Sequence, residues 1–345
     1  MTGPVVVDVE GTKLGDAERR RLLHPRVGMV ILFRRNYESA EQLAALTAEI
    51  RALRSPPLLI AVDHEGGRVQ RFREPPFTRI APMVRLGALW NEDVLRACRT
   101  AVAVGYVIAA ELRAHGIDLT FAPVLDLEWG RSSVIGDRAL HRDPRVVALL
   151  AAQLTHGMAL AGMGNCGKHF PGHGWPAADS HVAVPIDERP RAEIVAADAA
   201  PYRWLGIALA GVMPAHVIYP EVDDKPAGFS SRWIQGVLRR QLGFTGAVFT
   251  DDLSMAGAAV AGGIVARAQA ALDAGCDFVL ACNSPAGADE VLAGIRWRRT
   301  AAFEQRLARI VPRGTASTMG ELLRDATYLA ARDEVVAWSE AASPG

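Results

Sequence analysis

Short apolar runs alternate along the chain with longer segments in which apolar residues recur every three to four positions. The short runs predict eight strands, at Val5–Val9, Met29–Phe33, Leu58–Val62, Leu119–Pro123, Gly164–His169, Gly211–Ala215, Ala247–Thr250 and Phe278–Ala281. The longer segments predict helices at Ala17–Leu23, Ala40–Leu53, Glu92–His115, Pro144–Gly162, Ala192–Leu205, Arg232–Leu242, Ile264–Ala274 and Pro285–Ile295. Eight strand-and-helix repeats predict an α/β fold, a (β/α)8 TIM-type barrel with parallel strands.

The length of 345 residues would allow two domains, but no Ser/Gly/Pro-rich linker divides the chain. We therefore expect residues 1–345 to form a single (β/α)8 catalytic domain. The stretch 296–345 has apolar positions at helical spacing, and we expect it to be a helical extension packed on the barrel. A doubly wound sheet would also bring the ends of parallel strands together, so the strand count decides for the barrel.

The chain carries 38 basic and 38 acidic side chains, and this balance gives no electrostatic footprint for nucleic acid or an anionic membrane. No apolar run reaches the roughly 18 residues of a membrane span, and no leader pattern opens the chain. The four cysteines lack CxxC spacing, so neither a zinc site nor a disulfide framework is indicated. We expect a soluble, cytoplasmic protein, a monomer with reduced thiols, that binds neither nucleic acid nor membrane.

Polar residues stand at or just after the ends of five of the predicted strands. They are Asp63, Asp126, Lys168, His169, His216, Asp251 and Asp252. In a parallel barrel these strand ends share one face, and that face carries the chemistry. The sequence therefore predicts that these side chains gather at one site.

The segment KHFPGHGWPAADSH, residues 168–181, combines several titratable groups with glycines and prolines that exclude a long regular element. Asp179 and His181 are two positions apart, so a modest bend would set the carboxylate beside the imidazole. Such a carboxylate fixes the tautomer of a histidine and raises its basicity, which suits proton transfer near neutral pH. A solvated turn is the alternative, and the density of titratable groups favours a site.

Asp251 and Asp252 are adjacent carboxylates at the end of a buried strand. Successive residues of a strand point to opposite faces, so one can face a pocket while the other caps the following turn or helix. Only one of the two is expected to be catalytic. Taken alone, such a pair would serve as a helix cap or as metal ligands about as often as it supplies a nucleophile.

These residues carry a family resemblance. VDHEGGRVQRF at 62–72, FAPVLDL at 121–127, VIGDRAL at 134–140, KHFPGHG with DSH, MPAH and TDDLSMAG occur here in that order. The chain resembles glycoside hydrolase family 3, and in particular its bacterial cytoplasmic β-N-acetylglucosaminidases, or β-N-acetylhexosaminidases, of peptidoglycan recycling. The motifs span about Val6 to Cys282.

The resemblance implies a role for several positions. Asp251 matches the family's nucleophile, with Thr250 in place of the usual Ser. Asp179 and His181 match an Asp-x-His dyad in which the histidine is the general acid/base and the aspartate orients it. The chain ends soon after its eighth strand, so we expect the barrel to supply its own proton carrier rather than to borrow a Glu from a second domain.

The family's sugar-binding positions match a further set of residues, namely Asp63, Arg71, Arg138, Lys168 and His169. His64 is a departure, since relatives usually carry Gln there. From the residues alone, Asp126 reads as an internal hydrogen-bond organiser, and His216 is equally compatible with supporting the site from behind and with contacting the substrate.

The expected enzyme is a retaining exo-β-N-acetylglucosaminidase that removes terminal β-linked N-acetylglucosamine from muropeptides or other N-acetylglucosamine-containing oligosaccharides, without metal or organic cofactor. The alternatives are a β-N-acetylglucosaminide phosphorylase with the same dyad, a catalytically silent sugar-binding protein, and a metal-dependent hydrolase with His and Asp ligands. The sequence leaves anhydro-muropeptide and chitobiose open as substrates.

Overall fold

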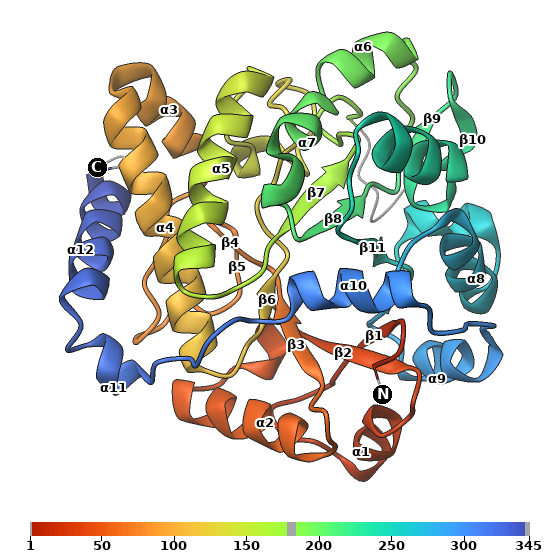
Figure 1. The fold of residues 1–345 in the computed structure, drawn as a ribbon, viewed down its shortest axis with the longest axis horizontal. Coiled ribbons are helices and arrows are strands. Elements are labelled where there is room, and N and C mark those ends of the chain that lie inside the picture. The colour runs from red at the N-terminus through yellow and green to blue at the C-terminus, as the bar shows by residue number, and fades with distance from the viewer. Residues whose placement is uncertain (1, 178–183, 342–345) are drawn as a thin grey trace.

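The computed structural model describes residues 2–177 and 184–341 and has the form of a closed parallel barrel surrounded by helices (Figure 1). Eight strands form one sheet in the order β6-β3-β2-β1-β12-β11-β8-β7, and isolated parallel bridges Leu119↔Gly164 and Val124↔Lys168 join its two ends. The barrel strands are β1 (Val5–Asp8), β2 (Val27–Leu32), β3 (Leu59–Val62), β6 (Leu119–Thr120), β7 (Cys166–Phe170), β8 (Gly211–Pro214), β11 (Ala247–Asp252) and β12 (Phe278–Ala281). The predicted (β/α)8 fold class is confirmed.

Two small antiparallel pairs lie outside the barrel sheet, namely β4 (His64–Gly66) with β5 (Val69–Gln70) and β9 (Ile218–Tyr219) with β10 (Asp223–Pro226). The α-helices are α1 (Asp16–Leu22), α2 (Ala40–Ala52), α3 (Val84–Glu92), α4 (Val94–Ala114), α5 (Pro144–Leu160), α6 (Arg191–Ala196), α7 (Ala200–Leu205), α8 (Ile264–Ala274), α9 (Pro285–Gly294), α10 (Ala301–Ile310), α11 (Met319–Leu322) and α12 (Ala326–Ala341). Within the described ranges, no helix is long and apolar enough to cross a membrane.

Apolar residues fill both faces of the barrel strands, because the outer face packs on helices and the inner face fills the barrel. On β1, Val5 and Val7 belong to the outer cluster, whereas Val6 belongs to the inner one. Phe303 and Ile310 of α10 join the inner cluster, so α10 covers the amino-terminal end of the barrel. The carboxyl ends of the strands remain open for a site.

Four predicted elements differ from the structure in their boundaries. The predicted helix Ala192–Leu205 is two helices, α6 and α7, because Pro201 lacks an N–H group and is accommodated in the first turn of a new helix. The helix predicted at Glu92–His115 begins as α4 only after Asp93, whose side chain accepts a hydrogen bond from Arg96 N, and the preceding helix α3 was not predicted.

The fourth strand and the sixth helix are the other two cases. The strand predicted to end at Pro123 pairs regularly only over Leu119–Thr120, since proline donates no ladder hydrogen bond. Arg232–Gln241 is a π-helix rather than an α-helix. The residues after 296 form α10, α11 and α12, and α12 packs along α4 (Figure 1).

Candidate active site

A pocket of about 510 Å³ opens at the carboxyl ends of the barrel strands. Its polar lining comes mainly from three places: the end of β3 with the β4–β5 hairpin, the end of β7, and the end of β11. The polar and charged residues that line it are Asp63, Glu65, Arg68, Arg71, Ser133, Arg138, Lys168, His169, His173, Asp251, Asp252, Ser254 and Asn283. Parallel strands thus bring together residues that are far apart in the sequence.

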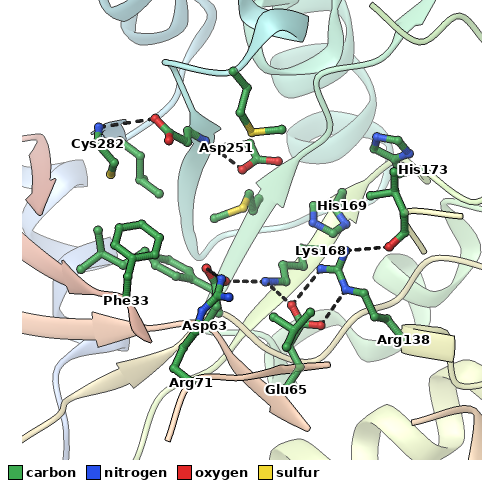
Figure 2. A pocket seen from close by; sticks show the side chains of 18 of the residues that line it. Phe33, Asp63, Glu65, Arg71, Arg138, Lys168, His169, His173, Asp251 and Cys282 are labelled. Carbon is green, nitrogen blue, oxygen red and sulfur yellow. Dashed lines mark hydrogen bonds and ion pairs between the residues drawn. The ribbon is translucent and has the colours of Figure 1, made fainter. Parts of the chain in front are cut away.

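One wall of the pocket is a buried network of charges (Figure 2). Lys168 Nζ lies 2.7 Å from Asp63 Oδ1 and 2.6 Å from Glu65 Oε1. Arg138 donates two hydrogen bonds to Glu65, each of 2.8 Å. Because Glu65 contacts both cations, it fixes their positions relative to each other.

The network sets the ionisation of its members. Burial would raise the pKa values of Asp63 and Glu65, but Lys168 beside both, Arg71 beside Asp63 and Arg138 beside Glu65 hold these pKa values below the usual range. Burial would lower the pKa of Lys168, and the two carboxylates instead raise it. All three groups are therefore charged at neutral pH.

Arg71 is the least satisfied cation of the pocket. It donates one hydrogen bond of 3.3 Å to Asp63 Oδ2 and lies over the ring of Phe33, 5.8 Å from its centroid. Its buried Nε has no hydrogen-bond partner in the part of the chain that the structure describes. The guanidinium therefore keeps donors for a polar ligand.

Asp126 organises the end of β7 from behind the pocket. Its carboxylate accepts hydrogen bonds from His169 N at 3.2 Å and from His173 N at 2.7 Å, and it lies 2.7 Å from His169 Nδ1. This contact assigns the proton to Nδ1 of His169 and leaves Nε2 for the pocket. Asp126 does not line the pocket itself.

The two carboxylates at the end of β11 have different surroundings. Asp252 accepts hydrogen bonds from Ser254, from Cys282 N and from Asn283 Nδ2, so its oxygens are engaged by the protein. Asp251 points into the pocket (Figure 2), and among the residues that the structure describes its carboxylate accepts a hydrogen bond only from Asp252 N, at 2.8 Å.

The environment keeps Asp251 ionised. Burial would raise its pKa, but the imidazoles of His216 and His169 and the hydrogen bond from Asp252 N lower it overall. His216 is fully buried behind the strand, stacks on Phe229, and has its Nε2 3.2 Å from the carbonyl of Asp252. It supports the strand that carries Asp251 and does not line the pocket.

Most residues singled out from the sequence meet here. Asp63, Arg71, Arg138, Lys168, His169 and Asp251 line one pocket, whereas Asp126 and His216 lie behind it. Asp179 and His181 lie outside the described residues. His64 does not line the pocket, because its ring is buried between Phe72 and Phe77, where burial lowers its pKa to about 3.

Sequence reasoning gave no role to Glu65 and passed over His173. Glu65 stands inside the VDHEGGR motif, two residues after Asp63, and on an extended segment this spacing places both side chains on one face. That spacing was the available signal. Among the described residues, no group of three His, Cys, Asp or Glu side chains is arranged to hold a metal ion.

An eight-stranded parallel barrel with ionised carboxylates and cations gathered around one pocket at its strand ends places the chain among the (β/α)8-barrel enzymes. Residues 5–312 match the model of the glycosyl hydrolase family 3 N-terminal domain. The chain belongs to glycoside hydrolase family 3.

Several named relatives and one solved structure are similar to this chain over nearly its whole length. A beta-hexosaminidase of Bordetella parapertussis is 57% identical over 331 residues, which are 96% of this chain and 94% of that protein. A beta-hexosaminidase of Thiobacillus denitrificans is 58% identical over 335 residues, 96% of this chain and 93% of that protein. The crystal structure of NagZ from Neisseria gonorrhoeae in complex with N-trifluoroacetyl-D-glucosamine has a TM-score of 0.92 at 47% identity and 98% coverage of both chains.

Proposed function

We propose that this glycoside hydrolase, a β-N-acetylhexosaminidase, is a retaining exo-enzyme that removes terminal β-linked N-acetylglucosamine through a covalent glycosyl-enzyme intermediate. The observation that carries the proposal is the contrast at the end of β11. Asp251 is ionised and faces the pocket, whereas the oxygens of Asp252 accept hydrogen bonds from the protein. A carboxylate with free acceptor capacity is the group that a retaining glycosidase uses as its nucleophile.

The sugar-binding part of the proposal rests on the charged wall opposite Asp251. Lys168 and Arg138 present cationic donors, and Asp63 is a carboxylate acceptor. With Arg71 and His169, these groups can donate to and accept from the hydroxyls of one terminal sugar. A pocket of about 510 Å³ has room for one terminal sugar, which suits an enzyme that acts at a chain end.

We assign the proton transfers to His181, oriented by Asp179, on the family resemblance of the DSH segment. In the first step His181 would donate a proton to the leaving oxygen while Asp251 attacks the anomeric carbon and the glycosidic bond breaks. In the second step it would accept a proton from water as water displaces Asp251.

The substrate is proposed to be a cell-wall fragment carrying N-acetylglucosamine on an anhydro-muramoyl peptide, cleaved by a monomer in the cytoplasm. The bound N-trifluoroacetyl-D-glucosamine of the Neisseria gonorrhoeae NagZ structure supports an N-acyl glucosamine in the pocket. No metal or organic cofactor takes part in the proposed steps.

The test compares hydrolysis of an aryl β-N-acetylglucosaminide with that of the matching β-glucoside and β-galactoside. We expect turnover of the first only, with release of the β-anomer as the initial product in proton NMR spectra. Comparable rates on all three would overturn the N-acetyl assignment. A sugar phosphate formed in phosphate buffer would identify a phosphorylase instead.

His181→Ala tests the proton carrier. General acid/base catalysis contributes about 10²–10⁴-fold, and less when the leaving group is a good anion. The variant should fail on disaccharides, yet still release acidic phenols. Added azide needs no base and should accelerate turnover and yield the β-glycosyl azide. Equal slowing of both substrate types without azide rescue would assign His181 to binding or structure.

A further inference from the structure

Glu111 is a buried carboxylate in the middle of the barrel's helical layer, well outside the pocket lining. It lies on α4, is 1% exposed, and makes no ion pair among the residues that the structure describes. Three donors surround it instead. Thr78 N donates to Oε2 at 2.9 Å, and Thr78 Oγ1 and Tyr328 OH donate to Oε1 at 2.5 and 2.8 Å.

These donors come from two segments that are far apart in the sequence. Tyr328 is fully buried on α12, the helix that runs along α4 in Figure 1, and Thr78 precedes α3. Near its carboxyl end, α12 contacts the same stretch again, because Ala81 N donates to Ser339 Oγ at 3.1 Å. Glu111 and α12 therefore hold segment 78–82 at both ends.

The β4–β5 hairpin packs on segment 78–82 and is hydrogen-bonded to it. The side chain of Gln70 donates to Thr78 O at 2.7 Å and accepts from Ile80 N at 3.0 Å, and Gly67 N donates to Ile80 O at 2.9 Å. A Cβ atom on Gly67 would come within 2.9 Å of Pro82 Cα. The close approach leaves the hairpin little freedom to move independently of the segment.

The hairpin in turn carries the charged wall of the pocket. Glu65 is in β4 and holds Lys168 and Arg138, while Arg71 directly follows β5 and Asp63 directly precedes β4. Hydrogen bonds thus run from α12 through Glu111 and segment 78–82 to Gly67 and Gln70 of the hairpin, and the backbone of the hairpin connects these residues to the groups proposed to bind the sugar.

The family match ends at residue 312, whereas α12 spans Ala326–Ala341. The helix α12, which lies beyond the matched family domain, therefore contacts Glu111 and segment 78–82, and these support the residues proposed to bind the sugar. We propose that α12, through the hydrogen bonds of Tyr328 and Thr78 to Glu111, positions the β4–β5 hairpin for substrate binding. Glu111, Thr78 and Tyr328 are positioning residues in this inference, which rests on the proposed function.

The mildest test removes one oxygen. Tyr328→Phe keeps the buried ring and deletes the hydroxyl. Groups that bind the sugar equally in ground and transition states affect KM rather than kcat. We expect KM for an aryl β-N-acetylglucosaminide to rise about 3–30-fold with kcat little changed, and binding of N-acetylglucosamine, followed by calorimetry, to weaken in parallel.

Glu334→Gln is the matched control. Glu334 is also on α12 and accepts a hydrogen bond from Thr100 of α4 at 2.5 Å, but within the described part of the chain it makes no hydrogen bond or ion pair with segment 78–82. Gln keeps an acceptor oxygen for Thr100 but loses the charge, so this substitution should lower the melting temperature slightly and leave KM and the affinity for N-acetylglucosamine unchanged. If Tyr328→Phe behaves like this control, α12 only packs against the barrel and the inference is wrong.

Substitutions at Thr78 provide a second, independent test of the inference. Thr78→Val deletes the hydroxyl that shares Oε1 with Tyr328, whereas Thr78→Ser retains it and should restore KM. The double variant Thr78→Val/Tyr328→Phe should be less impaired than the product of the single effects, since both act through one oxygen. If the effects of the two substitutions on KM simply multiply in the double variant, they do not act through one oxygen, and this part of the inference is wrong.

Failure of the wild-type chain to bind N-acetylglucosamine or cleave its aryl glycoside would overturn the proposed function, and this inference with it. Variants that match an active wild type would overturn the inference alone.

Discussion

At the scale of single residues, the two carboxylates at the end of β11 should be separable by substitution. Asp251→Ala should lower kcat by about 10⁴-fold or more, because the covalent route needs this oxygen, while the fold persists. Asp252→Asn should retain far more activity and lose stability, since it alters hydrogen bonds to Ser254 and Asn283. A fluorinated glycosyl inactivator should label the peptide at Asp251 in mass spectra. A label at Asp252 or Asp63 would reassign the nucleophile.

Glu65 is the residue on which the charged wall depends. Glu65→Gln would leave Lys168 and Arg138 buried without one of their carboxylates, and truncating one partner of such a pair costs about 2 kcal/mol or more. We expect kcat/KM to fall about 30-fold or more, as measured by steady-state kinetics.

The matched control for Glu65 is Asp118→Asn. Asp118 is also buried and ion-paired, with Arg51, but it immediately precedes β6 at the other end of the barrel. The Asp118→Asn substitution should lower the stability of the folded protein and leave KM unchanged. Equal kinetic effects of the two substitutions would mean that Glu65 serves stability alone.

The strand ends revealed much of the pocket from sequence, because in a parallel barrel the residue after each strand reaches the same face. Asp63, Lys168 and Asp251 were placed this way. The sequence favoured an internal role for Asp126 but left His216 open between supporting the site and contacting the substrate, since a side chain's facing depends on local register and on partners such as Phe229. Glu65 was missed although its position two residues after Asp63 on an extended segment was a usable signal.

At the scale of elements, apolar periodicity located every barrel strand because each is buried on both faces. It located helix boundaries less well. The predicted helix Ala192–Leu205 ran through Pro201, where α7 begins, and the helix predicted from Glu92 begins instead after Asp93, whose side chain caps α4. The preceding helix α3 was not predicted. The buried contact between α4 and α12 had no sequence signal, since Glu111 and Tyr328 are 217 positions apart.

That contact predicts a pH dependence of stability. Burial raises the pKa of Glu111 from 4.5 to about 7. A raised folded-state pKa contributes stability that is present below pH 4.5 and is lost as the pH rises through 7, about 3 kcal/mol in all. Relative to Glu111→Gln, the wild type should therefore become less stable between pH 5 and 8 in urea unfolding.

Other ionisable groups lie near Glu111, namely Arg332 and Tyr328 from α12 and His115, which follows α4 and whose Nδ1 contacts the backbone carbonyl of Glu111. Their titration is common to both proteins and cancels in the difference to first order. A wild-type minus variant difference that stays flat from pH 5 to 8 would show that Glu111 does not titrate in this window.

At the scale of the whole molecule, barrel closure is what makes a site of distant residues. The ring of eight parallel strands sets Asp63, Lys168 and Asp251 around one opening, although nearly two hundred positions separate the first from the last. The strand count predicted this arrangement. The closing bridges between β6 and β7 were beyond sequence reasoning, because they depend on the register of two strands that pair only at isolated positions.

The charge distribution across the pocket yields the last prediction, which separates the proposed mechanism from metal-dependent hydrolysis. Asp63 and Glu65 are neutralised by Lys168, Arg71 and Arg138, and these cations would repel a divalent ion from the same oxygens. We expect exhaustive dialysis against EDTA to leave kcat and KM on an aryl β-N-acetylglucosaminide unchanged. The same dialysis applied to a known zinc hydrolase provides the positive control. Loss of activity that a divalent metal restores would show that a metal ion, rather than Asp251 and the proton carrier alone, drives the reaction.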